Sequence, residues 1–120
     1  MKLLRVGAPG AELPAVVSES GQMYDASSVT SDYNGRFFAE NGLSLLRQAL
    51  SEHRLPVIHS ELRIGTPVAK PGKIVCIGLN YVDHAFEAGL EAPKEPVVFL
   101  KAPETAVGAR DTVLVPRGSS

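Results

Sequence analysis

The chain has 120 residues, with 12 Lys and Arg against 13 Asp and Glu, and a net charge of −1 near neutral pH. A length of this order suits one ordinary domain with a modest core. The charges balance without a run of either sign, which excludes the basic tracts typical of proteins that bind nucleic acids or anionic membranes. We therefore expect no nucleic-acid or membrane partner and a small molecule as the ligand.

Cysteine content and the N-terminus predict the compartment. A single cysteine, Cys76, excludes an internal disulfide framework and fits a reducing environment. The opening residues MKLLRVGAPGAE lack the long apolar stretch of a secretory signal, and no segment reaches the roughly 18 apolar residues of a membrane span. These features predict a cytoplasmic protein.

The first part of the chain has the pattern of a small antiparallel sheet. LLRVG, at residues 3–7, is a short strand candidate. In PAVVSESGQMYDASS, two further strand candidates flank residues 19–22, as strands flank a hairpin turn. We expect another turn at Asn34-Gly35.

An amphipathic helix is predicted next, within NGLSLLRQALSEHRLP. Leu43, Leu46 and Leu50 recur at helical spacing on one face, with Ala49 beside them, and Pro56 closes the segment.

Residues 58–72 contain Pro67 and Pro71 and show little periodicity, which is typical of a connector. We therefore expect a small N-terminal α+β domain at residues 1–66 and a second domain at residues 67–120. The second domain should be rich in strands, at IVCIG, VVFLKA and DTVLV.

The stretch GLNYVDHAFEAG, residues 78–89, predicts a short helix between the first two of these strands. Asn80 can act as its N-cap, Asp83 stands at N3, and Gly89 can end it in the left-handed conformation. Two turns are marginal for an isolated helix, so this segment has the character of a mobile lid.

His84 and Glu87 lie three residues apart, hence on one face of that helix, where a touching pair could move a proton. The alternative is a solvated ion pair on a surface helix. Lys101 ends a strand, where its ammonium could meet a substrate carboxylate or enolate or could simply reach solvent. Cys76, inside an apolar run, is better explained as a buried thiol than as a nucleophile.

The segments KIVCIGLNYVDHAFEAG, EPVVFLKAPETAVG and DTVLVPRGS resemble, in order and spacing, the opening of the catalytic domain of the fumarylacetoacetate hydrolase family. Within it, MKLLRVGAPG and PVAKPGKIVCIGLNY look most like bacterial members called ureidoglycolate lyase or 2,4-diketo-3-deoxy-sugar-acid hydrolase. The resemblance implies an α+β, β-rich fold: a small N-terminal domain, then a mixed β-roll catalytic domain built around a divalent metal, commonly in a homodimer.

The resemblance also implies roles for particular residues. His84 and Glu87 would be catalytic and activate water from a lid helix, while Asn80, Tyr81 and Lys101 would bind substrate. A Mg²⁺ or Mn²⁺ ion would hold the pyruvoyl end of a 2,4-diketo acid, and attack of hydroxide on the distal carbonyl would release pyruvate and a second acid. The complete protein would thus be a hydrolase of C–C bonds in ketonic substrates.

The metal ligands of such family members, a Glu-x-Glu pair and a later acidic residue, follow the PRGS turn, so none is expected in this chain and all are expected downstream of Ser120. We therefore expect the chain to be an N-terminal fragment that is inactive alone and has exposed strand edges that favour association. Two alternatives stay open: a lyase, decarboxylase or isomerase of the same family, such as ureidoglycolate lyase, or a non-catalytic binding module without a metal site.

Overall fold

The computed structural model describes residues 1–119, which form two units. The N-terminal unit comprises Met1–Lys70 together with the segment from Val107 onward, and the hairpin unit comprises Pro71–Ala106. The return of the chain to the first unit at Val107 has no signal in the sequence. The domain bounds 1–66 and 67–120 stay a prediction.

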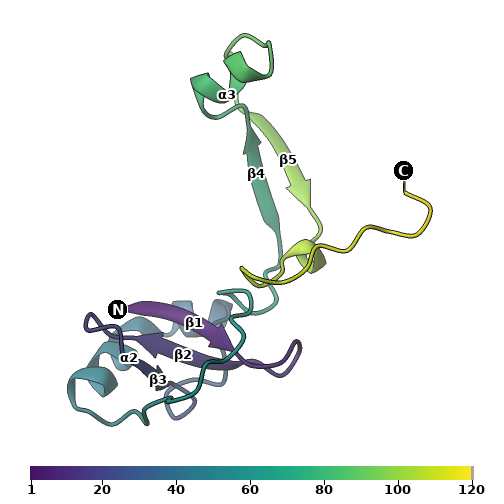
Figure 1. The fold of residues 1–120 in the computed structure, drawn as a ribbon. Coiled ribbons are helices and arrows are strands. Elements are labelled where there is room, and N and C mark those ends of the chain that lie inside the picture. Colours follow the sequence, from purple (N-terminus) through teal and green to yellow (C-terminus); the bar gives the residue numbers. More distant parts are fainter. Residues whose placement is uncertain (120) are drawn as a thin grey trace. The chain divides into compact units, whose positions relative to one another are not determined.

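The N-terminal unit contains the predicted antiparallel sheet, with strands β1 (Lys2–Val6), β2 (Leu13–Val17) and β3 (Met23–Asp25) in the order β1-β2-β3 (Figure 1). The predicted hairpin turn joins β2 to β3, where Ser18 and Gln22 share a backbone hydrogen bond of 2.9 Å. Gly21 takes a φ of 86° in that turn, a conformation that glycine adopts without steric cost. The central strand β2 is the most buried of the three.

Two helices cover this sheet, α1 (Gly35–Ala39) and α2 (Gly42–Ser51). Helix α2 confirms the predicted amphipathic segment, because Leu46 and Ala49 are fully buried and Leu43 and Leu50 pack against the same core. The buried core of the unit consists of Val16, Ala26, Tyr33, Phe37, Leu46, Ala49 and Leu55. Sheet and helices therefore close over one small hydrophobic core.

Helix α1 replaces the turn predicted at Asn34-Gly35. Asn34 is the N-cap of this helix, and its Oδ1 accepts a hydrogen bond of 3.1 Å from the Phe37 amide. The same residue type serves turns and helix caps, and here burial of the Phe37 ring against Tyr33, at 4.9 Å between centroids, stabilises the helix.

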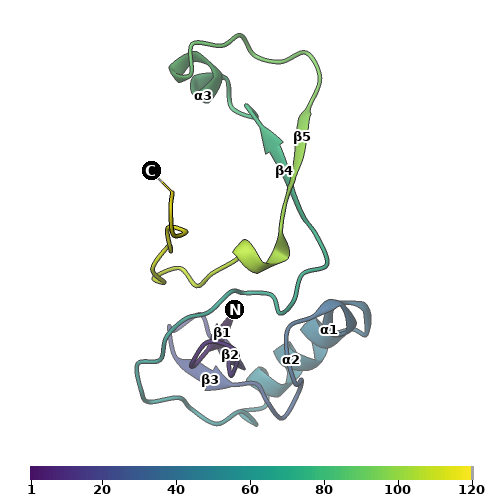
Figure 2. The same cartoon turned by 90° about the vertical axis from the view of Figure 1, so that its right-hand side faces the viewer.

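The hairpin unit contains strand β4 (Ile74–Gly78), helix α3 (Val82–Glu87), strand β5 (Val97–Lys101) and the 3₁₀ turn η1 (Pro103–Thr105). The strands β4 and β5 are antiparallel neighbours in a two-stranded ribbon, which confirms the strands predicted at IVCIG and VVFLKA. Figure 2 shows α3 and the segment after it at the end of the ribbon where β4 stops and β5 starts.

The strand predicted at DTVLV does not form. Residues 111–115 carry no strand, and Val113, Leu114 and Val115 are exposed. The residues of this run favour β-structure, but a strand also needs a partner backbone. Within residues 1–119 no other strand pairs with this run.

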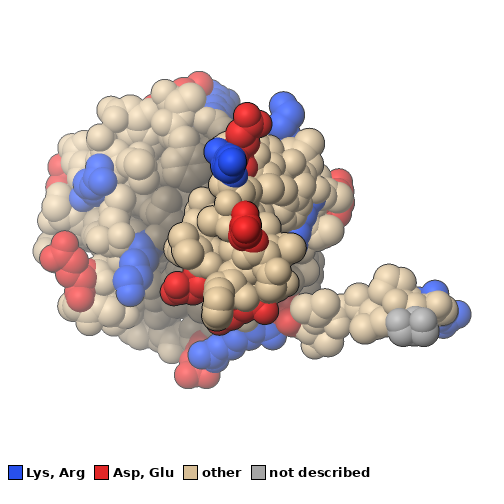
Figure 3. Space-filling view, turned by 90° about the horizontal axis from the view of Figure 1, so that it is seen from above, with Lys and Arg blue, Asp and Glu red and all other residues tan. Residues whose placement is uncertain are grey.

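The surface agrees with the balanced composition. In the space-filling view of Figure 3, Lys and Arg side chains are interspersed with Asp and Glu side chains over the visible face. Among residues 1–119, no helix has the length and apolar character needed to cross a membrane.

Candidate active site around helix α3

The ribbon of β4 and β5 fixes where the predicted site residues lie. Gly78 pairs with Val97 next to α3, whereas Ile74 pairs with Lys101 at the other end. Four steps along the strand lead from one pair to the other, a span of about 13 Å at 3.3 Å per residue. Paired residues share a face, so Ile74, Cys76 and Lys101 point to the same side of the ribbon. Cys76 is half-buried rather than buried as expected, because no second layer covers this two-stranded sheet within the hairpin unit.

The chain enters α3 through an unusual backbone conformation at Leu79, whose φ is 49°. This left-handed region is rare for residues with a Cβ atom and marks a constrained position. The N-cap of α3 is Tyr81, with extended backbone angles and no side-chain capping bond, so the predicted N-cap role of Asn80 is wrong. The left-handed turn at Leu79 delays the start of the helix by one residue.

The end of α3 confirms the predicted role of Gly89. Its φ is 68°, its amide donates to the Phe86 carbonyl at 2.9 Å, and the Leu90 amide donates to the Ala85 carbonyl at 2.9 Å. These two bonds define a Schellman motif, which satisfies carbonyl groups that the last helical turn leaves open. The short helix therefore has a firm C-terminal stop.

His84 and Glu87 both occupy α3, and both are exposed. Within residues 1–119, no hydrogen bond or ion pair joins the two side chains. Ala85 is the only buried residue of the helix, and Phe86 is 84% exposed. The helix thus presents its polar and apolar side chains to solvent, and the pairing of His84 with Glu87 stays a prediction.

A depression of about 330 Å³ lies within the hairpin unit, where the start of α3 faces the segment 92–96. Its polar lining groups are Asn80, Lys94 and Glu95, and its apolar ones include Ile77 and Val82. Of the five predicted site residues, Asn80 lines this depression and the other four do not. The segment 92–96 contains Pro93 and Pro96, and no signal in the sequence indicates that it folds back toward Asn80.

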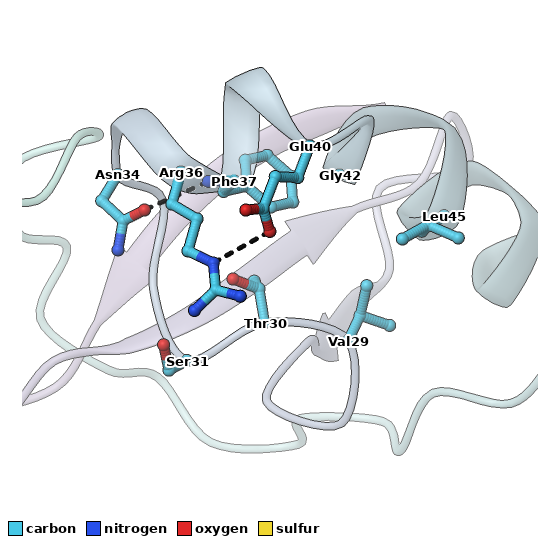
Figure 4. Close-up of a pocket in the computed structure, with 9 residues that line it drawn as sticks. All are labelled: Val29, Thr30, Ser31, Asn34, Arg36, Phe37, Glu40, Gly42 and Leu45. Atoms are coloured by element: carbon cyan, nitrogen blue, oxygen red, sulfur yellow. Dashed lines mark hydrogen bonds and ion pairs between the residues drawn. The ribbon is translucent and has the colours of Figure 1, made fainter.

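A second depression, of about 270 Å³, lies in the N-terminal unit beside α1. Figure 4 shows that its charged groups are bonded to each other, because Arg36 Nε contacts Glu40 Oε2 at 2.8 Å. Asn34, which also lines it, is engaged as the cap of α1. This depression therefore has no free polar group of the kind that acid–base chemistry requires.

The described residues do not fit a divalent cation. Within residues 1–119, no group of three or more His, Cys, Asp and Glu side chains lies close enough together to hold a metal ion. The half-buried carboxylates of Glu12, Asp32 and Asp111 bind arginines instead, and a hydrogen bond from Arg63 lowers the pKa of both Glu12 and Asp111. No metal step is therefore assigned to residues 1–119.

Comparison with known proteins supplies the family context. Residues 73–120 match a family model described as "Fumarylacetoacetate (FAA) hydrolase C-terminal". A Burkholderia multivorans protein is 45% identical over 119 residues, which are 99% of this chain and 42% of the relative. A Burkholderia cenocepacia protein is 44% identical over the same shares of both chains. Both relatives carry the name "Putative hydrolase".

The fold has a counterpart among solved structures. The crystal structure of a Mycobacterium smegmatis protein described as a "putative HpcE protein" superposes with a TM-score of 0.68 at 24% identity and covers 99% of this chain. That match spans 42% of the solved chain. The chain therefore spans about two fifths of the length of the curated relatives and of the structure that it matches.

Proposed function

We propose a function from one premise: the chain belongs to the fumarylacetoacetate hydrolase family. On this premise, the whole protein is a divalent-metal-dependent hydrolase that cleaves a C–C bond in a 2,4-diketo acid of the acylpyruvate type. The products are pyruvate and a second carboxylic acid. The observation that carries the proposal is the family match over residues 73–120, which contain β4, α3 and β5.

In the proposed reaction His84 acts as the general base. Histidine titrates near neutral pH, and a neutral imidazole nitrogen can take a proton from water. Glu87 lies one helical turn further on and would accept a hydrogen bond from the other ring nitrogen, which orients the ring. The exposure of both side chains leaves them accessible to a substrate that arrives from solvent.

The hydroxide formed in this way attacks the carbonyl carbon distal to the substrate carboxylate. The adjacent C–C bond breaks, its electron pair passes to the enolate of pyruvate, and the enolate takes up a proton. Divalent cations supply Lewis-acid stabilisation of such an enolate when bound. We assign those cation ligands to polypeptide outside residues 1–120.

Substrate binding is proposed for Asn80, Tyr81 and Lys101. The Asn80 carboxamide lines the depression beside α3 and can donate to a substrate oxygen. The exposed Tyr81 hydroxyl stands at the N-cap of α3. The Lys101 ammonium, on the ribbon face that carries Cys76, can pair with a carboxylate.

The test compares the full-length protein with its His84→Ala variant on a panel of acylpyruvates and related 2-oxo acids, with Mg²⁺, with Mn²⁺ and with a chelator. We expect the variant to lose activity on the order of 10²-fold or more, the usual contribution of a general base. Asp83→Ala is the matched control, because it removes a neighbouring polar side chain of the same helix and should keep most activity.

Equal turnover in wild type and His84→Ala would remove His84 from the mechanism. Turnover of ureidoglycolate, or decarboxylation without hydrolysis, would replace the proposed reaction by a lyase or decarboxylase reaction of the same family.

A further inference from the structure

Five charged side chains of the N-terminal unit form one network that includes Arg63, and no step of the proposed reaction uses it. Arg63 Nε contacts Asp111 Oδ1 at 2.7 Å and Arg63 Nη2 contacts Asp111 Oδ2 at 2.5 Å. The remaining nitrogen, Nη1, contacts Glu12 Oε1 at 2.9 Å and donates to the Gly7 carbonyl at 3.1 Å. The guanidinium of Arg63 thus forms a bidentate ion pair with the Asp111 carboxylate and a further charged contact with the Glu12 carboxylate.

Glu12 extends this cluster to the edge of the sheet. Its Oε2 lies 3.5 Å from Arg5 Nη2, and Arg5 in turn contacts both oxygens of Asp32, at 2.6 and 3.0 Å. The Glu12 and Arg5 side chains are only 8% and 11% exposed. Exposed ion pairs contribute little to stability, but a shielded, doubly bonded network holds its geometry. We call Arg5, Glu12, Asp32, Arg63 and Asp111 the arginine clamp.

The backbone around Asp111 fits tightly against the residue after Arg63. A Cβ atom on Gly108 would stand 2.2 Å from the Ile64 carbonyl oxygen, so only glycine permits this approach. Asp111 Oδ2 also accepts the Gly108 amide at 2.7 Å, and the Asp111 amide donates to the Gly108 carbonyl at 3.0 Å. Residues 108–111 therefore form a closed turn seated on Arg63 and Ile64.

Two members of the clamp, Arg63 and Asp111, lie on either side of the hairpin unit in the sequence. Lys70 ends the first stretch of the N-terminal unit, and Val107 begins its second stretch. All five predicted site residues lie between them, in the hairpin unit Pro71–Ala106. A loop whose two ends are held to one body has less conformational freedom than a loop held at one end.

We infer that the arginine clamp holds both ends of the hairpin unit to the N-terminal unit. Arg63 and Asp111 are thereby positioning residues for the reaction. The second half of this inference rests on the proposed function, whereas the first half does not. The N-terminal unit then has a role of its own, because it anchors the hairpin unit, which carries His84 and Glu87.

Hydrogen exchange of the 120-residue chain tests the anchoring. Asp111→Asn keeps the shape of the side chain but removes its charge. Within residues 107–112 the Gly108 and Asp111 amides are hydrogen-bonded, and we expect these two amides to exchange about tenfold faster, as expected for loss of a charged hydrogen-bonded pair. Gly108→Ala keeps every charge but opposes the approach to Ile64, and it should speed exchange in the same segment. Glu40→Gln breaks an exposed ion pair of the same unit and serves as control, with no change at 107–112.

Unchanged exchange at 107–112 in both Asp111→Asn and Gly108→Ala would overturn the clamp, whatever reaction the protein catalyses. The positioning role is tested in the full-length protein by the kcat of Asp111→Asn and of Asp111→Glu, which restores the carboxylate. Lower kcat in the first with recovery in the second supports positioning. Equal kcat in both would overturn it, and absence of diketo-acid hydrolysis in the wild type would count against the proposed function but leave the exchange result standing.

Discussion

Removal of the Tyr33 hydroxyl tests how far one buried hydrogen bond stabilises the N-terminal unit. Tyr33 is 0% exposed, and its hydroxyl donates to the Ala15 carbonyl of β2 at 2.9 Å. Tyr33→Phe keeps the edge-to-face contact of the ring with Phe37 and removes only this bond. Because the Ala15 carbonyl loses a buried partner, we expect the free energy of unfolding to fall by about 1–3 kcal/mol.

Urea unfolding followed by far-UV circular dichroism measures this change, since α1 and α2 give the N-terminal unit its helical signal. Tyr81→Phe is the matched control, because Tyr81 is 74% exposed and its loss should change stability by less than about 0.5 kcal/mol. Equal losses in the two variants would show that the Tyr33 bond contributes nothing beyond an exposed hydroxyl and would refute the reasoning.

The stability difference between wild type and Tyr33→Phe should also depend on pH. Burial raises the pKa of Tyr33, and the nearby charges of Asp32 and Asp25 raise it further. An unfolded tyrosine loses its proton near pH 10, so the stabilisation from the raised pKa is complete below pH 10 and is lost as the pH rises toward the folded-state pKa. Above pH 10 this group alone lowers wild-type stability by up to about 1.4 kcal/mol per pH unit. The gap between wild type and Tyr33→Phe should therefore narrow between pH 10 and 11.

Two further predictions concern packing around α2, and both use the same unfolding measurement. Leu46→Ala should cost about 2–5 kcal/mol, because Leu46 is fully buried, whereas Leu45→Ala, at a half-exposed position, should cost less than about 1 kcal/mol. Gly42→Ala should destabilise by about 1–3 kcal/mol despite the better helix propensity of alanine, because its Cβ would lie 2.3 Å from the Phe37 ring. Gly35→Ala, which meets no atom within 4 Å, should be neutral or stabilising, and a reversed order of the two glycine variants would contradict this account.

Local signals in the sequence predicted the elements whose causes are local. The spacing of Leu46 and Ala49 marked the buried face of α2, and Gly89 marked the stop of α3, since a left-handed residue there allows both bonds of the Schellman motif. The hairpin turn before β3 likewise depends on Gly21 and its neighbours. Each of these features depends only on residues that lie a few positions apart in the sequence.

Features that depend on distant residues could not be predicted in this way. Helix α1 forms because Phe37 finds a place in a core built from β2 and α2, and the run at 111–115 lacks a strand because strand formation requires a second backbone. The contact of Arg63 with Asp111 joins residues 48 positions apart. Neither residue type nor spacing indicates such a pair.

The left-handed backbone at Leu79 changes which residues can replace it. Leucine and isoleucine are near equivalents in most apolar positions, but a branched Cβ at a φ of 49° is costly, whereas glycine and asparagine accept it readily. Ile77, two residues earlier in the β4 strand, has the opposite preference. Substitution tables that rank exchanges by hydrophobicity alone therefore mislead at Leu79, where backbone geometry and not side-chain character sets the tolerance.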